Sequence, residues 1–270
     1  MVEMEALNWA LLGVGALVVG LSKTALPGGG TLAVVLFAMA LPARESTAAL
    51  LVLLIVGDLF AISMYRKTVD WAILRRLIWP VLLGVAVGTV FLGIASDAAV
   101  RRVIGAILLA LLVFTLLRRR REARHQAGQQ APSQQPAPNQ QAAQDQVPRS
   151  GRPRARVAGF GYGWLGGFTT MVANAGGPVM SMYLLAMRLD VKTFLGTAAY
   201  FFFAVNLVKV PFQIGLGLLN TQILSIVLVL VPLVVVAAFL GRWIAGRISQ
   251  TVFERLVLGL TAVGAVNLLL

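Results

Sequence analysis

The sequence predicts an all-α, polytopic transmembrane protein built from two inverted repeats, each with a broken-helix hairpin plus three spanning helices. Three observations lead to this prediction. The 270 residues are 59% hydrophobic and only 12% charged, whereas soluble domains are about half apolar and about a quarter charged. Several apolar runs are long enough to cross a bilayer. The breaks, prolines and charges of the first half recur in the second.

Six apolar runs have the length of an ordinary membrane span, because a hydrocarbon core of roughly 30 Å requires about 20 helical residues. They are residues 45–65, 72–95, 99–117, 193–212, 222–246 and 252–270. Two further apolar regions, 6–42 and 157–190, are interrupted by glycine-rich stretches at Lys23 to Gly30 and Ala173 to Pro178. Each of these two regions predicts two short helices joined by a break.

These runs divide the chain into a first membrane repeat, 1–117, and a second, 157–270. The intervening segment, 118–156, holds nine Gln and five Pro without apolar periodicity, which predicts a disordered linker. Nine of the 23 basic residues also lie there, so much of the net charge of +13 is local to it. Basic loops fix membrane orientation. We therefore expect a cytoplasmic linker and no nucleic-acid partner.

The two halves align in order with few gaps. Placing residues 26–30 beside 173–177 brings Asp58 opposite Asn206 after one inserted residue. The same order then pairs Pro80 with Pro232, Gly93 with Gly246, Ser96 with Ser249 and Arg102 with Arg255. Basic residues in the short loops place both chain termini outside, so the repeats enter the membrane from opposite faces. Inverted repeats with paired broken helices are typical of secondary transporters, and we expect alternating access.

The two breaks predict a shared site for an anion. Unwound backbone inside a membrane persists only where it is packed in protein or lines a water-filled cavity. Glycines allow bare amide groups to approach a guest, and the helix beginning near Thr31 points its positive dipole end there. The predicted substrate-binding residues are Ser22, Lys23, Thr24, Gly28, Gly29, Gly30, Thr31, Thr169, Thr170, Asn174, Gly176, Gly177 and Asn206.

Three charged residues are of interest for the site, because charge within a membrane is costly. Lys23, directly before the first break, is expected to contact the anion; the alternatives are snorkelling to the interface or pairing with Asp58. Asp58 is a candidate for proton coupling, or a structural partner for a lysine. Lys209 lies near the outer end of its span and is expected to snorkel.

Other classes of function are less compatible with the sequence. The chain has no cysteine, which excludes disulfides and Cys-ligated metal sites. The single histidine, His125, lies in the linker, and Asp58 has no second carboxylate near it in its span. We expect no enzyme, no catalytic residues, no cofactor and no metal. The partners expected are a small anion and the lipid bilayer, while the oligomeric state stays open.

Several motifs resemble the sulfite exporter TauE/SafE family of bacterial permeases, over nearly the whole chain except the linker. They are the stretches Gly20 to Gly30 and Gly163 to Pro178, then Gly196-Thr197-Ala198, Asn206 and Pro211. The resemblance implies a multi-pass inner-membrane protein that exports small sulfur-containing anions such as sulfite or sulfonates. Two alternatives stay open: an importer or permease of another small oxyanion with the same fold, and a non-transporting membrane scaffold.

Overall fold

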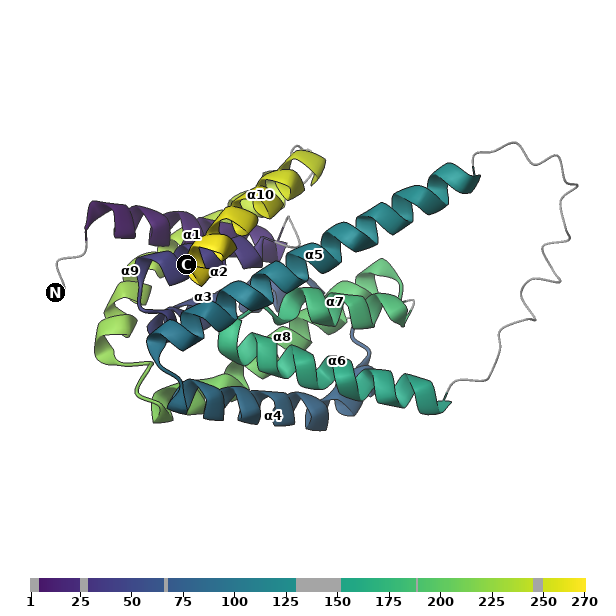
Figure 1. Cartoon of the computed structure of the whole chain (residues 1–270), viewed down its shortest axis with the longest axis horizontal. Coiled ribbons are helices and arrows are strands. Elements are labelled where there is room, and N and C mark those ends of the chain that lie inside the picture. The colour runs from purple at the N-terminus through teal and green to yellow at the C-terminus, as the bar shows by residue number, and fades with distance from the viewer. Residues whose placement is uncertain (1–4, 25–28, 66–67, 130–151, 188, 245–249) are drawn as a thin grey trace, which may run out of the picture.

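The computed structural model describes residues 5–24, 29–65, 68–129, 152–187, 189–244 and 250–270. Every element in this part of the chain is an α-helix (Figure 1). The first half contains α1 (Ala6–Thr24), α2 (Gly30–Ala40), α3 (Ala43–Tyr65), α4 (Trp71–Ile94) and α5 (Asp97–Gln129). The second half contains α6 (Arg152–Ala173), α7 (Gly176–Ala186), α8 (Val191–Gly215), α9 (Thr221–Ile244) and α10 (Gln250–Leu269). The predicted all-α class is confirmed.

Six of the described helices are long and apolar enough to cross a membrane: α1, α3, α4, α5, α8 and α9. Five of them match predicted spans, and α10 covers the sixth predicted run. The expectation of two short helices in each interrupted region was wrong for the first helix of each pair. α1 and α6 have 19 and 22 residues, whereas α2 and α7 have 11 each. Glycines inside α1 and α6 do not end these helices, because transmembrane helices tolerate glycine where neighbours pack closely.

Two helices extend into the predicted linker. α5 continues to Gln129, and α6 begins at Arg152. Arginine, glutamate, alanine and glutamine favour helix. The helix that forms the last span of the first half, α5, therefore continues through the polar residues that follow the span. Residues 130–151 lie outside the described residues, and the disordered linker stays a prediction there.

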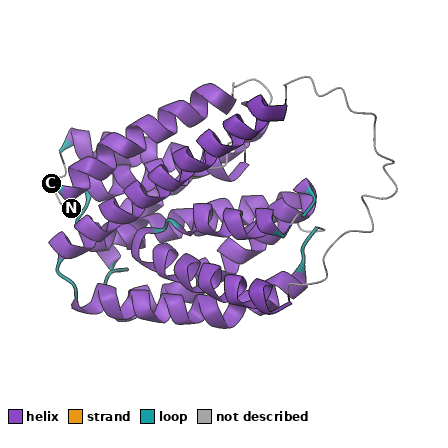
Figure 2. Cartoon of the chain, turned by 45° about the vertical axis from the view of Figure 1, so that its right-hand side comes forward, coloured by secondary structure: helices purple, strands orange, loops and turns teal. Residues whose placement is uncertain are grey.

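The two halves pack against each other in matching pairs. α1 lies against α9, and α6 lies against α4, so the first helix of each half contacts the fourth helix of the other. α3 packs against α8, and α5 against α10, which pairs equivalent helices of the two halves. α1 begins and α10 ends at one end of the bundle, whereas α5 ends and α6 begins at the other (Figure 2). This arrangement agrees with inverted repeats, which stay a prediction.

Glycines bring the paired helices into close contact. A Cβ added at Gly84 of α4 would meet the carbonyl of Trp164 in α6, and one added at Gly167 of α6 would meet the carbonyl of Val81 in α4. α1 approaches α9 in the same way at Gly20. Lipid provides no hydrophobic force between helices, so such backbone contact is a main source of helix association in membranes.

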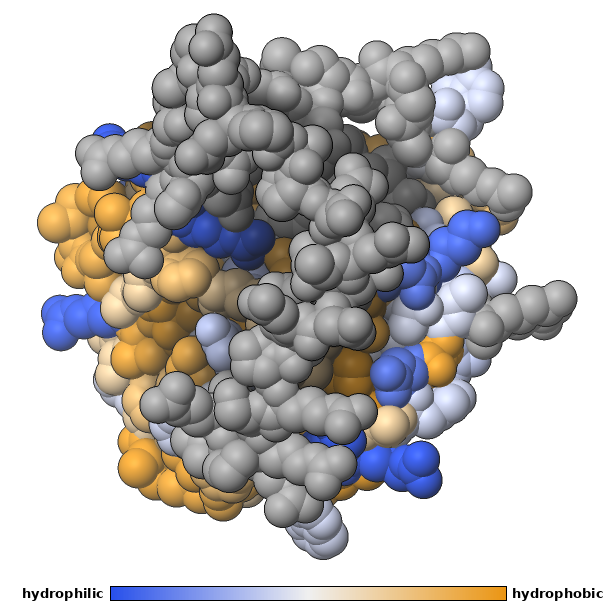
Figure 3. All heavy atoms as spheres, turned by 90° about the vertical axis from the view of Figure 1, so that its right-hand side faces the viewer, coloured by the Kyte–Doolittle hydropathy of each residue, from blue (hydrophilic) through white to orange (hydrophobic). Residues whose placement is uncertain are grey.

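The outward faces of the bundle are apolar. Large side chains such as Trp79, Leu228 and Val263 are 78%, 70% and 73% exposed, respectively. Apolar surface of this extent is rare on soluble monomers but suits lipid. Figure 3 looks onto the end where α5 ends and α6 begins, and it shows hydrophilic residues projecting there with hydrophobic residues on the flanks. The bundle therefore has apolar sides and a polar end.

The close contact between α4 and α6 predicts the effect of adding side chains along α6. Gly167→Val should lower the free energy of unfolding by about 3 kcal/mol, the upper part of the range for overpacking, because the new methyl groups meet backbone. The measurement is the midpoint of thermal unfolding in detergent. Gly161→Val on the same helix is the control, since a Cβ there meets no atom within 4 Å. Equal losses in the two variants would contradict the packing described.

Candidate functional site

The second half contains a break between α6 and α7. α6 ends at Ala173, and Asn174 follows in a left-handed conformation, with φ at 49°. Asparagine adopts this conformation more readily than most residues. The Asn174 N–H donates to the Thr170 carbonyl at 3.0 Å, and the Ala175 N–H donates to the Thr169 carbonyl at 3.2 Å. The last turn of α6 is thus closed by its own backbone, and the predicted break is confirmed here.

Both short helices begin without a side-chain cap. The residue that precedes α2 is Gly29, and the residue that precedes α7 is Ala175; neither makes a capping hydrogen bond from its side chain. An uncapped N-terminus presents backbone N–H groups and the positive end of the helix dipole. A Cβ at Gly30 or Gly177 would find open space. Gly28 and the side chain of Thr24, both predicted to bind substrate, lie outside the described residues.

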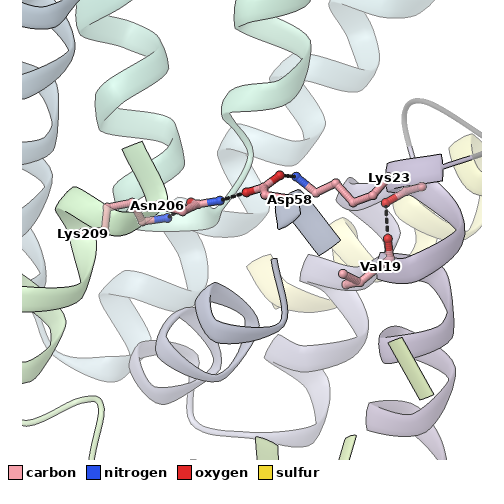
Figure 4. Close-up of polar contacts among 6 residues, drawn as sticks. Val19, Lys23, Asp58, Asn206 and Lys209 are labelled. Atoms are coloured by element: carbon pink, nitrogen blue, oxygen red, sulfur yellow. Dashed lines mark hydrogen bonds and ion pairs between the residues drawn. The ribbon is translucent and has the colours of Figure 1, made fainter. Parts of the chain in front are cut away.

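A chain of polar side chains connects the end of α1 to the end of α6. Figure 4 shows its part from Lys23 to Lys209. Lys23 Nζ donates to Asp58 Oδ1 at 2.5 Å, and Asn206 Nδ2 donates to Asp58 Oδ2 at 2.7 Å. Lys209 Nζ donates to Asn206 Oδ1 at 3.4 Å and to Asn174 Oδ1 at 2.5 Å. We call these five residues the polar chain. It runs from the end of α1 to the break after α6 through α3 and α8.

The centre of the polar chain is a contact between the two halves. Asp58 and Asn206, which the sequence alignment places opposite each other, are hydrogen-bonded directly. Residues that are equivalent in two repeats touch each other when both lie on the symmetry axis between the repeats. The contact therefore agrees with the predicted duplication.

The polar chain continues along α3 and α8 toward the start of α3. Asn174 Nδ2 donates to the Thr47 carbonyl at 2.9 Å, and Gln213 Nε2 donates to Thr47 Oγ1 at 3.3 Å. Two buried side-chain atoms in the described residues have no hydrogen-bond partner: Gln213 Oε1 and Arg44 Nε. In native proteins nearly all buried polar atoms have a hydrogen-bond partner, so an unpaired buried atom requires an explanation.

The charges of the polar chain do not balance. Asp58 is 1% exposed, and its one negative charge faces both Lys23 and Lys209. Lys23 forms an ion pair with Asp58. Its Nζ also lies 5.2 Å from the centroid of the Phe202 ring, and the face of an aromatic ring attracts a cation. Lys209 is 0% exposed and forms no ion pair within the described residues; its partners are two neutral amide oxygens. A buried charge without a counterion is costly.

The comparisons with known proteins agree with a membrane transporter. A family profile described as sulfite exporter TauE/SafE matches residues 12–268 of the chain. The protein belongs to the TauE/SafE family. This is a family of membrane transporters, so the chain is a multi-pass membrane protein of a transporter family. Neither a search of curated proteins nor a search of solved structures finds a match.

Two expectations about lysines in this TauE/SafE protein can now be compared with the structure. The alternative in which Lys23 pairs with Asp58 is confirmed; its role toward an anion stays a prediction. The expectation that Lys209 snorkels to the interface was wrong. Lys209 faces the break after α6, and the amides of Asn174 and of Asn206 in its own helix provide acceptors that a lipid-facing lysine would lack.

The remaining predicted residues make local contacts outside the polar chain. The hydroxyls of Ser22 and Thr169 donate to carbonyls of their own helices. Thr31 Oγ1 lies 3.4 Å from Thr261 Oγ1 of α10, and Thr170 is buried. Of the predicted set, the structure therefore brings Lys23, Asn174 and Asn206 together with Asp58. Ser22 and Thr169 instead bond to their own helices, and Thr31 lies against α10.

Sequence reasoning missed three residues of the TauE/SafE site: Lys209 as a buried group, Gln213 and Thr47. One signal was present. Asn206, Lys209 and Gln213 have the spacing i, i+3, i+7 in an otherwise apolar span, which puts all three on one helical face. A polar face within a membrane helix indicates a side that turns away from lipid.

The charge at the centre of this TauE/SafE protein predicts the outcome of a residue exchange. Asp58→Asn leaves Lys23 and Lys209 without a carboxylate and should cost about 3–5 kcal/mol of unfolding free energy, as breaking a buried pair does. The double variant Asp58→Asn/Asn206→Asp keeps one carboxylate and one amide in the same contact, so it should recover most of the unfolding midpoint in detergent. A double variant no more stable than Asp58→Asn would contradict the contact between the repeats.

Proposed function

We propose that this TauE/SafE protein exports small sulfur-containing anions, such as sulfite or organosulfonates, across the inner membrane by alternating access around the polar chain. The observation that carries the proposal is the unbalanced charge: Lys23 and Lys209 face one carboxylate, Asp58. A transported anion supplies the negative charge that the fold itself lacks. A scaffold whose polar groups only joined helices would gain nothing from the extra buried cation.

The groups around the polar chain suit an oxyanion. Oxyanion oxygens each accept several hydrogen bonds, and charge-assisted bonds from ammonium groups are the strong class. Lys209 is one such donor, and the uncapped starts of α2 and α7 add backbone N–H groups next to the two breaks. A Cβ added at Gly30 or Gly177 would meet no atom within 4 Å, so no neighbouring side chain packs against these positions.

The distribution of basic residues supports a cytoplasmic linker. Thr68 Oγ1 donates to the Lys192 carbonyl at 2.8 Å, so α4 and α8 begin side by side. In Figure 1 they begin at the end of the bundle where α5 ends. The exposed Arg75, Arg76 and Lys192 all lie near these starts, as the positive-inside rule predicts for a cytoplasmic end. An inside-negative potential then favours anion export, by about 2.3 kcal/mol per charge per 100 mV.

The role of Asp58 follows from its contacts. Both of its oxygens are engaged, one by Lys23 and one by Asn206. In this state Asp58 joins α1 to α3 and α8, and the pair it forms with Lys23 must loosen if Lys23 is to bind an anion. Opening of this pair is therefore the step at which anion binding is coupled to movement of α1, and a proton on Asp58 would assist it.

Lys209→Met tests the proposal. We expect efflux of labelled sulfite from proteoliposomes to fall at least tenfold, because a charge-assisted hydrogen bond contributes about 1.5–3 kcal/mol and about 1.4 kcal/mol corresponds to tenfold. The unfolding midpoint should hold or rise, since the variant removes a buried cation that has no counterion. Lys192→Met, at an exposed lysine of the same helix, is the control. Unchanged efflux in a folded Lys209→Met protein would contradict the anion site.

A further inference from the structure

We propose that Gln213 selects among anions by accepting a hydrogen bond from the substrate, so that the preferred ligand is a monoanion that carries one hydrogen-bond donor of its own. This inference rests on the proposed function and goes beyond it, because it concerns the protonation or substitution of the anion. The chemical class includes hydrogen oxyanions and sulfonates that bear a hydroxyl group. They share one anionic group and one donor.

The orientation of the Gln213 amide is fixed by Thr47. The Thr47 hydroxyl donates its proton to the Arg44 carbonyl at 2.7 Å, so it can only accept from a further partner. Gln213 Nε2 donates to this hydroxyl oxygen at 3.3 Å. Turning the amide over would place Oε1 against the Thr47 hydroxyl oxygen, whose proton is already donated to the Arg44 carbonyl. The amide nitrogen therefore faces Thr47, and the amide oxygen points away from it.

The amide oxygen of Gln213 is left without a donor. Gln213 is 0% exposed, and Oε1 has no hydrogen-bond partner among the described residues. An unsatisfied buried carbonyl is costly, whereas the same group paired with a donor is favourable. Gln213 thus offers one acceptor position to a guest.

This acceptor lies on the same face of α8 as the ammonium of Lys209. Gln213 follows Lys209 by four residues on α8, which places the two side chains on one helical face. Asn174 and Thr47 link them from the other side, because Asn174 binds both Lys209 Nζ and the Thr47 carbonyl. The four residues form a ring with a cationic donor at one point and a neutral acceptor at another. We call it the Lys209–Gln213 ring.

The ring favours one kind of anion. The anionic oxygen of the ligand accepts from Lys209, and the donor of the ligand satisfies Gln213 Oε1. An anion without a donor directs lone pairs at the carbonyl oxygen and leaves it unpaired. Sites built to bond a substrate hydroxyl reject analogues that lack it for this reason. The ring therefore discriminates against fully deprotonated oxyanions and unsubstituted sulfonates.

A matched pair of sulfonates tests the proposal. Initial efflux from proteoliposomes is measured for 2-hydroxyethanesulfonate and for ethanesulfonate, which differ by one hydroxyl group. In a parallel series, the efflux of sulfite is measured from acidic pH, where the anion carries a proton, to alkaline pH, where it does not. This series tests a donor on the oxyanion itself, whereas the sulfonates test a hydroxyl donor on carbon. We expect the wild type to prefer the donor-bearing form about tenfold in at least one series. Gln213→Met should remove that preference, because neither form of the ligand then meets a carbonyl oxygen that requires a donor.

Different outcomes contradict the role of Gln213 and the proposed transport function. Gln222→Met, at an exposed glutamine of α9, should keep the preference of the wild type. Equal rates for both forms in the wild type would overturn the role of Gln213, even if Gln213→Met does not fold. A preference that survives in folded Gln213→Met would also overturn it. If the wild type carried neither sulfonates nor sulfite, the proposed function itself would fail.

Discussion

A charge inside a membrane protein needs a counterion, and the centre of this protein has one carboxylate for two lysines. Asp58 neutralises Lys23 and orients Asn206. Lys209 donates hydrogen bonds to two amide oxygens, which carry no net charge. The break after α6 supplies one of these amides, so the local unwinding of the helix and the solvation of the lysine depend on each other. The proposed anion would supply the negative charge that this arrangement lacks.

The imbalance coincides with a difference between the two halves. Asp58 and its equivalent, Asn206, meet where α3 and α8 cross. A repeat with aspartate at both positions would have two acids for two lysines; the amide at 206 reduces this to one. Around this centre, glycine contacts hold α1 against α9 and α6 against α4. If the halves are repeats, as the sequence predicts, the difference between Asp58 and Asn206 is a departure from symmetry that leaves one lysine without a carboxylate.

Much of this architecture could be predicted from the sequence. The apolar runs gave the long helices, and the alignment of the halves paired Asp58 with Asn206. The burial of Lys209 could not be predicted, because hydropathy does not reveal which face of a membrane helix turns inward. Gln213 was missed for a related reason. The orientation of its amide depends on Thr47 of another helix, whose hydroxyl proton is donated to the Arg44 carbonyl. The lengths of α1 and α6 depended on close contacts with α9 and α4 that the glycine spacing alone did not specify.

The central claim is that an anion completes the polar chain, and an experimental structure with selenite tests it most directly. Selenium scatters anomalously, so its position can be assigned without interpreting weak density. The account predicts an anomalous peak within hydrogen-bonding distance of Lys209 Nζ that disappears in Lys209→Met crystals. A protein that exports sulfite but shows selenium only at surface arginines, with Lys209 still bound to the two amides alone, would contradict the account.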